Sequence, residues 1–182
     1  AKLRPVFERV TGTVTAGNSS QLTDGAASII LMREKKCKKL GLKPLGFLKD
    51  YAYAALAPNR MGMGPVYATS LLLQKTGLRL SDFDLIEMNE AFAAQVIANE
   101  RAFASDEYAK RNLGRDKALG EIDRAILNVN GGGIALGHPV GATGTRLVLT
   151  ILKELRERKK KRGLTTLCVG GGQGAALAVE VE

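Results

Sequence analysis

Three short stretches of the chain carry side chains that could do chemistry. His138 is the sole histidine, and it lies in the glycine-rich stretch NGGGIALGHPVGATG. Cys168 opens the stretch CVGGGQG, and Asn89 lies in the stretch MNEAF. An imidazole can take and return a proton or polarise a thioester oxygen, and a thiol can serve in acid–base work. These residue types therefore indicate proton transfer beside a polarised carbonyl.

Each of these residues also has a structural interpretation. His138 could be a satisfied histidine in a tight turn, and Cys168 could be a buried structural cysteine. Asn89 could cap a helix predicted over 90–103. Gly170, two residues after Cys168, could present a bare backbone N–H, which is the component that an oxyanion hole needs.

Three predicted strands would bring these groups together. Asn89 follows a strand over 84–88, Cys168 belongs to the end of one over 165–169, and His138 follows one over 125–129. Strand ends of this kind can meet at one edge of a sheet, so we expect the three side chains to line one small cavity.

The rest of the chain alternates between helix and strand signals. The order indicates a single α/β domain over 1–182, with a βαβαβαββ-type mixed five-stranded sheet and helices on both faces. The regions 57–65 and 105–121 are predicted to be mainly loop. Predicted helices span 33–40, 66–75, 90–103 and 143–159, and further predicted strands or extended stretches span 25–32, 43–56 and 175–180.

Composition excludes several classes of protein. The 182 residues contain no apolar run of 18 or more, and the N-terminal stretch is too charged for a signal peptide. Cys37 and Cys168 are far apart and do not suggest a disulfide framework, so a reducing cytoplasm is the simplest setting. No cluster of cysteines and histidines has metal-ligand spacing, and we expect no metal site.

The motifs NEAF, GHPVGATG and CVGGGQG occur in the order and at roughly the spacing seen in the C-terminal half of the thiolases. The chain resembles this family from about Gly12 to Glu182. The resemblance implies a thiolase-like C-terminal lobe of an acyl-CoA:acetyl-CoA C-acyltransferase, which cleaves 3-ketoacyl-CoA with CoA in fatty-acid β-oxidation. PNRMGMGPVYAT and GATGTR look like the degradative type. A biosynthetic acetoacetyl-CoA thiolase, condensing two acetyl-CoA, and a non-catalytic lipid-binding or partner module remain alternatives.

The resemblance also implies a role for each residue. His138 would activate a nucleophilic cysteine and help to stabilise the enolate oxygen. Cys168 would remove a proton from the α-carbon of acetyl-CoA, or return one in degradation. Asn89 would hold a water that completes a first oxyanion hole with His138, and the Gly170 N–H would contribute to a second.

Two more residues match positions around the substrate, and one expected residue is missing. Phe92 is similar to a pocket-wall phenylalanine, and Ser20 to a serine that contacts the pantetheine arm of CoA; ordinary turn composition also explains Ser20. The family's nucleophilic cysteine lies in an N-terminal half that this chain lacks. Cys37, flanked by lysines on a predicted surface helix, is not expected to replace it, so the isolated chain should not turn over.

The formal net charge is +9, and much of it lies in the runs REKKCKK (33–39) and RERKKKR (156–162). These runs are either solvated helix ends or sites of attraction for an anionic ligand, such as the phosphates of CoA. Aromatic residues are not interleaved with them, which argues against nucleic acid.

CoA and acyl-CoA are the expected substrates, with no bound cofactor. The expected partners are an N-terminal thiolase lobe, further copies in a homo-oligomer and a β-oxidation multienzyme partner, with no membrane span.

Overall fold

The computed structural model describes residues 2–182, so only Ala1 of the predicted 1–182 domain lies outside it. Its centre is a mixed four-stranded sheet in the order β1-β4-β3-β2. β4 pairs antiparallel with both β1 and β3, whereas β2 and β3 run parallel. The predicted mixed α/β sheet is confirmed, but it has four strands instead of five. The strands are β1 (Phe47–Ala55), β2 (Leu85–Met88), β3 (Arg162–Val169) and β4 (Gln173–Glu180).

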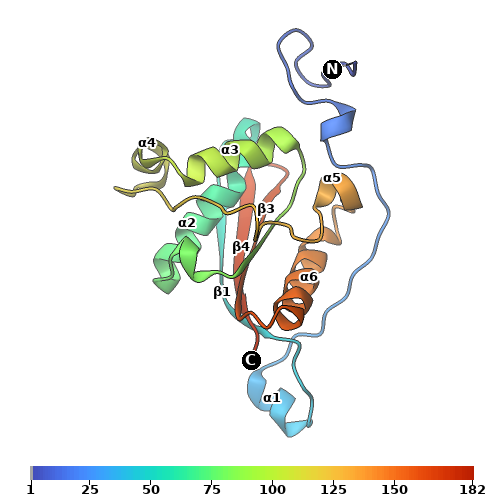
Figure 1. Cartoon of the computed structure of the whole chain (residues 1–182), viewed down its shortest axis with the longest axis vertical. Coiled ribbons are helices and arrows are strands. Elements are labelled where there is room, and N and C mark those ends of the chain that lie inside the picture. Colours follow the sequence, from blue (N-terminus) through green and yellow to red (C-terminus); the bar gives the residue numbers. More distant parts are fainter. Residues whose placement is uncertain (1) are drawn as a thin grey trace.

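Helices cover both faces of this sheet, as predicted (Figure 1). α2 (Gly64–Thr76) and α3 (Ala93–Phe103) lie on one face, where Leu72 and Phe103 are buried against strand residues such as Leu164. α6 (Thr143–Glu157) lies on the other face and buries Ile151 and Leu155 against Leu85 and Val179. Successive strand residues point to opposite faces, so one sheet supplies both cores.

Short helical pieces complete the chain. The helix predicted over 33–40 is confirmed as α1, and part of the predicted loop 57–65 forms a 3₁₀ helix because its backbone closes local turns. The region 105–121 is mostly irregular, as expected, with two short helical turns. These elements are η1 (Ala16–Asn18), α1 (Glu34–Lys39), η2 (Pro58–Met63), η3 (Leu80–Asp82), α4 (Asp106–Tyr108), η4 (Ala109–Leu113) and α5 (Gly133–Leu136).

The strand predicted over 25–32 is wrong. This apolar segment is extended but pairs with no strand among residues 2–182, and the side chains of Ile30 and Leu31 are 85% and 75% exposed. An apolar run indicates that a segment prefers burial, but it does not identify the surface that buries it.

The strand predicted over 125–129 is reduced to a single bridge. Leu127 bridges Ile86 in parallel, and the Ile86 backbone exchanges hydrogen bonds with Ile126 and Asn128. Asn128 then turns to a φ of 46°, which removes it from the extended conformation and stops the ladder. The fifth strand is therefore missing because the chain turns away after one bridge.

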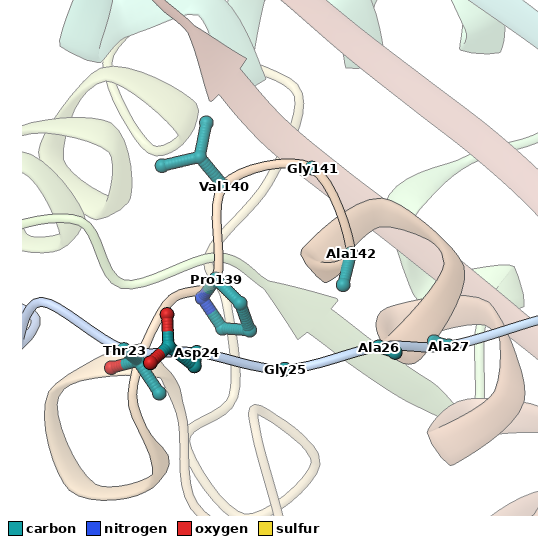
Figure 2. A pocket seen from close by; sticks show the side chains of 9 residues that line it. All are labelled: Thr23, Asp24, Gly25, Ala26, Ala27, Pro139, Val140, Gly141 and Ala142. Carbon is teal, nitrogen blue, oxygen red and sulfur yellow. The ribbon is translucent and has the colours of Figure 1, made fainter.

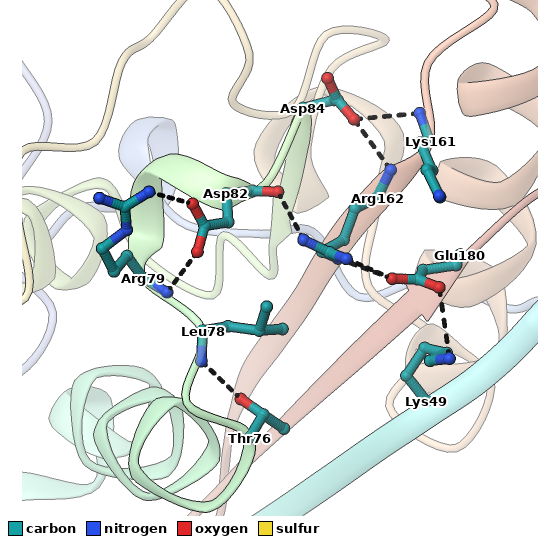
Figure 3. A network of polar contacts seen from close by, with 9 residues as sticks. All are labelled: Lys49, Thr76, Leu78, Arg79, Asp82, Asp84, Lys161, Arg162 and Glu180. Atoms are coloured by element: carbon teal, nitrogen blue, oxygen red, sulfur yellow. Dashed lines mark hydrogen bonds and ion pairs between the residues drawn. The ribbon is translucent and has the colours of Figure 1, made fainter.

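A polar network fixes the beginnings of β2 and β3 (Figure 3). The Asp84 carboxylate, just before β2, accepts the backbone N–H groups of Lys161 and Arg162 at 3.0 and 2.9 Å. The Arg162 guanidinium donates in turn to Glu180 of β4 at 2.7 Å. These bonds set the register where β2 and β3 begin, and hence the position of the carboxyl ends of these strands.

The two basic runs meet at one end of the molecule. Arg156, in the last turn of α6, donates through Nε and Nη2 to the carbonyl oxygens of Leu45 and Pro44, both at 2.7 Å. The segment 40–45 follows α1 directly, so residues 33–39 and 156–162 become neighbours in space. His138 lies near the opposite end of α6, a helix length of about 20 Å away.

None of the helices within residues 2–182 is long and apolar enough to cross a membrane.

Candidate active site

Three parallel segments end at the same edge of the sheet. The segment 126–128 bridges β2 in parallel, and β2 pairs in parallel with β3. The Asn89 N–H continues the ladder one step beyond β2 and donates to the Thr166 carbonyl at 3.0 Å. Asn89 and Cys168 therefore lie at neighbouring positions of this edge, and the loop that carries His138 leaves from the same edge.

The ring of His138 is held at both nitrogens. Nδ1 lies 2.6 Å from the Thr143 hydroxyl oxygen, and that hydroxyl donates to the Pro139 carbonyl at 3.0 Å. With its own proton directed at Pro139, the hydroxyl must accept from Nδ1–H. Nε2 then carries the lone pair, and it faces the Asn89 Nδ2 amide at 3.3 Å. The hydrogen-bond pattern thus assigns a neutral imidazole with its acceptor nitrogen towards Asn89.

Burial favours the same charge state. The His138 pKa lies below its usual value, first because burial disfavours the imidazolium and second because the Arg146 charge repels it. Near neutral pH the ring is consequently an uncharged base. A neutral imidazole whose tautomer is fixed by a second hydrogen bond is suited to accept a proton at Nε2.

Asn128 and Glu90 connect the two loops of the site. The Asn128 side chain accepts from the Met88 N–H at 2.8 Å and donates to the Met88 carbonyl at 2.9 Å. It also donates to Glu90 at 3.0 Å, and the other oxygen of Glu90 accepts the Ile134 N–H at 3.3 Å. Both chain neighbours of Asn89 are thereby tied to the loop that leads to His138.

Residues 23–27 cross the other side of the loop that carries His138. The Thr23 hydroxyl accepts the His138 N–H at 3.2 Å. Gly137 has a φ of 98°, and a Cβ there would lie 2.4 Å from the Thr23 hydroxyl oxygen, so this position requires glycine. Beside the crossing, residues 23–27 and 139–142 line an open groove of about 390 Å³ (Figure 2).

Cys168 lies at the expected edge of the sheet, but its thiol is not hydrogen-bonded to the imidazole. Within residues 2–182 no hydrogen bond joins its thiol to His138. Thr166 of the same strand faces α2, where its hydroxyl lies 3.5 Å from the Pro65 carbonyl, and strand alternation gives Cys168 the same face. Cys168 is 7% exposed, and burial raises the pKa of its thiol.

The remaining site residues fall into two places. Gly170 is exposed in the turn between β3 and β4, with open space where a Cβ would be. Ser20 lies against the MNEAF segment, because its N–H donates to the Ala91 carbonyl at 2.9 Å. The Phe92 ring stacks edge-on against Phe7 at a centroid distance of 5.6 Å.

Sequence reasoning missed four residues of this site. Thr143 fixes the tautomer of His138, Glu90 and Asn128 hold the loops, and Arg146 places a charge nearby. Glu90 and Thr143 are part of the NEAF and GHPVGATG motifs, so a polar residue within each motif was an available signal. Asn128 offered none, because its role depends on an unusual φ.

Two further expectations concern sites elsewhere. Cys37 is buried on α1, where its thiol donates to the Leu42 carbonyl at 3.2 Å, at the end of the molecule that carries the basic runs. Over residues 2–182, no group of three or more His, Cys, Asp or Glu side chains is arranged to hold a metal ion.

Comparison with known proteins identifies the family. The thiolase C-terminal domain matches residues 42–181, and the thiolase N-terminal domain matches residues 1–35. A 3-ketoacyl-CoA thiolase of Pectobacterium carotovorum is 54% identical over the whole chain, and one of Photorhabdus laumondii is 55% identical. The chain spans 42% of the length of each of these relatives.

Solved structures agree with this result. The acetyl-CoA acetyltransferase of Bacillus anthracis superposes with a TM-score of 0.85 at 43% identity, over 98% of this chain and 41% of that one. Human mitochondrial 3-ketoacyl-CoA thiolase gives a TM-score of 0.80 at 42% identity, again over 98% and 41%. The same human enzyme in complex with CoA gives 0.79 at 40% identity, over 100% and 41%. With the sheet, the three motifs and these relatives in agreement, the chain belongs to the thiolase family.

Proposed function

We propose that residues 1–182 supply the acid–base half of a 3-ketoacyl-CoA thiolase, an acyltransferase that cleaves 3-ketoacyl-CoA with CoA. The observation that carries this proposal is the His138 ring held between the Thr143 hydroxyl at Nδ1, 2.6 Å away, and the Asn89 amide at Nε2, 3.3 Å away. Such a ring can take the proton of an attacking thiol and return it later. The names of the 54–55% identical relatives support the same reaction.

In this reaction His138 would activate a nucleophilic cysteine supplied by the protein outside residues 1–182. Asn89 would hold a water beside the developing oxyanion, and its amide lies 3.3 Å from the His138 ring nitrogen. The exposed Gly170 turn would offer a backbone N–H to the second oxyanion.

Cys168 would exchange the proton of the α-carbon. Its raised thiol pKa keeps it protonated near neutral pH, which suits the delivery of a proton to a leaving enolate. Because no hydrogen bond joins its thiol to His138 within residues 2–182, the substrate itself would lie between the two groups, each acting on a different atom.

CoA is the proposed substrate and not a permanently bound cofactor. The groove between residues 23–27 and 139–142 would receive its pantetheine arm (Figure 2). Ser20 precedes this groove by three residues, and its neighbour Ser19 forms a backbone bridge with Phe92. The human relative has been solved with CoA, which supports binding of this molecule by the fold.

The proposed partners follow from the exposed segment 25–32. Its apolar side chains would pack against an N-terminal thiolase lobe, with residues 42–181 as the C-terminal domain. Further copies of the protein and a β-oxidation multienzyme partner are additional proposals. The two free thiols, Cys37 and Cys168, favour the cytoplasm as the location.

A chimera tests the proposed reaction. Residues 1–182 replace the matching 42% of the Pectobacterium carotovorum enzyme, and thiolysis of 3-ketoacyl-CoA substrates is followed by the loss of enolate absorbance. We expect activity that falls by about 10³-fold or more in His138→Ala and Cys168→Ala, since each removes a proton-transfer group. Cys37→Ala is the matched control and should stay active. Undiminished thiolysis in His138→Ala would refute the assignment.

The biosynthetic direction is the second candidate. It is favoured by the acetyl-CoA acetyltransferase of Bacillus anthracis, which has a TM-score of 0.85, compared with 0.80 for the human thiolase. Condensation of two acetyl-CoA by the same chimera, measured against its thiolysis of long-chain substrates, would distinguish the two directions.

A further inference from the structure

A charged side chain lies about one helical turn after the hydroxyl that binds the histidine ring, and it has no hydrogen bond within residues 2–182. Arg146 is three residues after Thr143 in α6, and therefore on the same side of the helix as the hydroxyl that binds the ring. All three guanidinium nitrogens are buried and lack a hydrogen-bond partner within residues 2–182. The nearest carboxylate is that of Glu87, with its Oε2 3.7 Å from Arg146 Nη1, and Glu87 is 2% exposed.

This arrangement is costly for stability. A guanidinium remains charged at any physiological pH, and a buried charge without close hydrogen bonds is usually less stable than an apolar residue of the same size. Thr165, the register partner of Glu87, also has an unpaired buried hydroxyl, as Asn89 has an unpaired Oδ1. Such unsatisfied groups tend to persist at functional sites.

We propose that Arg146 is a positioning residue that keeps the His138 imidazole uncharged, with the Glu87 carboxyl of β2, 3.7 Å away, as its counter-ion. The charged groups around it are few. His138 is influenced by Arg146, and Arg146 faces Glu87 of β2. Glu87 is influenced by Arg146, by Glu90 and by Glu154 on α6.

The charge on Glu87 sets the pH range in which the Arg146 charge is compensated. Burial raises the pKa of Glu87 to about 7, although Arg146 opposes that rise. Below this pH the Glu87 carboxyl is neutral, so the Arg146 charge is no longer compensated and opposes a second positive charge on the His138 ring. The Nε2 lone pair therefore stays available in the range where an ordinary histidine becomes charged. The benefit of this lone pair for acyl transfer rests on the proposed function, but the control of the His138 charge by Arg146 does not.

The single histidine makes the test direct. In the purified chain, ¹H–¹⁵N spectra of the imidazole follow the charge and tautomer of His138 through a pH titration. We expect Arg146→Gln and Arg146→Met to shift the His138 midpoint upward, because the repelling charge is gone. Arg146→Lys keeps a charge and should keep the midpoint low.

Glu87→Gln is the discriminating control. The carboxyl is already neutral where His138 titrates, so this variant should leave the midpoint low although it also removes the buried pair. An effect through packing alone would move the midpoint in the same direction in Glu87→Gln and Arg146→Gln. That result, or an unshifted midpoint in folded Arg146→Gln, would overturn the proposal. If both uncharged Arg146 variants fail to fold, the two variants that keep a positive charge decide the proposal. An upward shift of the His138 midpoint in Glu87→Gln then overturns it. A low His138 midpoint in both Glu87→Gln and Arg146→Lys supports it.

The readout needs no turnover, so the proposal and the thiolase assignment can fail separately. A chimera without thiolysis but with the expected midpoints would retain the charge control and remove the proposed function.

Discussion

Glu87 should make the chain less stable as pH rises, and Glu87→Gln should remove that dependence. The folded-state pKa of Glu87 is raised from 4.5 to about 7, mainly by burial. A carboxyl with a raised folded pKa contributes its full stability below the unfolded pKa and loses it as pH rises through the folded pKa. The relevant window therefore runs from about pH 4.5 to about pH 7.

The size of the effect follows from that shift. A rise from 4.5 to about 7 corresponds to about 3 kcal/mol of unfolding free energy, most of which is lost between pH 5 and pH 8. This is a large fraction of the stability of a typical domain. His138 acts in the opposite sense, because its lowered pKa removes stability as pH falls, but it is present in both proteins and cancels in the comparison.

Urea unfolding at a series of pH values measures the difference. We expect the free energy of unfolding of the parent chain to fall, relative to that of Glu87→Gln, by about 2–3 kcal/mol between pH 5 and pH 8. Glu121→Gln replaces an exposed glutamate and is the matched control, with a profile parallel to that of the parent. Parallel profiles for Glu87→Gln and the parent would show that the carboxyl is ionised throughout and that the argument from burial is wrong.

Three other predictions concern the groups that hold the site. Thr143→Val should cost about 1 kcal/mol and release the His138 ring, so that imidazole ¹⁵N shifts show a mixture of tautomers in place of the Nδ1–H form; an unchanged tautomer would contradict the assignment. Asn128→Ala should lower the free energy of unfolding by about 2–4 kcal/mol, because it loses the hydrogen bonds to Met88 and keeps an unfavourable φ. Asn128→Gly should recover about 1 kcal/mol of this loss, because glycine adopts that φ without strain. Denaturant midpoints of the two variants test this order. Gly174→Ala should lower the melting temperature sharply, since its Cβ would lie 2.1 Å from the Gly64 carbonyl oxygen. Gly144→Ala, within α6, is the control: its Cβ would have its nearest neighbour at 4.0 Å, so it should be neutral or stabilising by up to about 1 kcal/mol. Equal melting temperatures of the two variants would refute the close approach at Gly174.

The elements were predictable where the local pattern was strong. Leu147, Ile151 and Leu155 repeat at helical spacing, and α6 forms where that repeat predicts it. β2, β3 and β4 contain the apolar stretches predicted as strands, with ends displaced by up to three residues. The apolar segment 25–32 failed because its pattern states a preference for burial without identifying a partner. The segment 125–129 failed because a single residue, Asn128, leaves the extended conformation.

The candidate site, too, was only partly predictable from the sequence. Residue types and motif order alone selected His138, Asn89 and Cys168. Imidazole and thiol groups are among the few that can exchange a proton and lie here in distinctive glycine-rich turns, whereas Asn89 was selected by the NEAF motif. Which nitrogen of His138 carries the proton was decided by Thr143 and Pro139, and this depends on a hydroxyl direction that only the folded loop sets.

The sequence by itself determined the family, the kinds of reactive group and most of the helices and strands, since these depend on residue type and local period. Only the tertiary structure placed Arg146 3.7 Å from Glu87, from segments about 60 residues apart. Burial, charge pairing and pKa depend on distance and solvent access, and a linear order of residues contains neither.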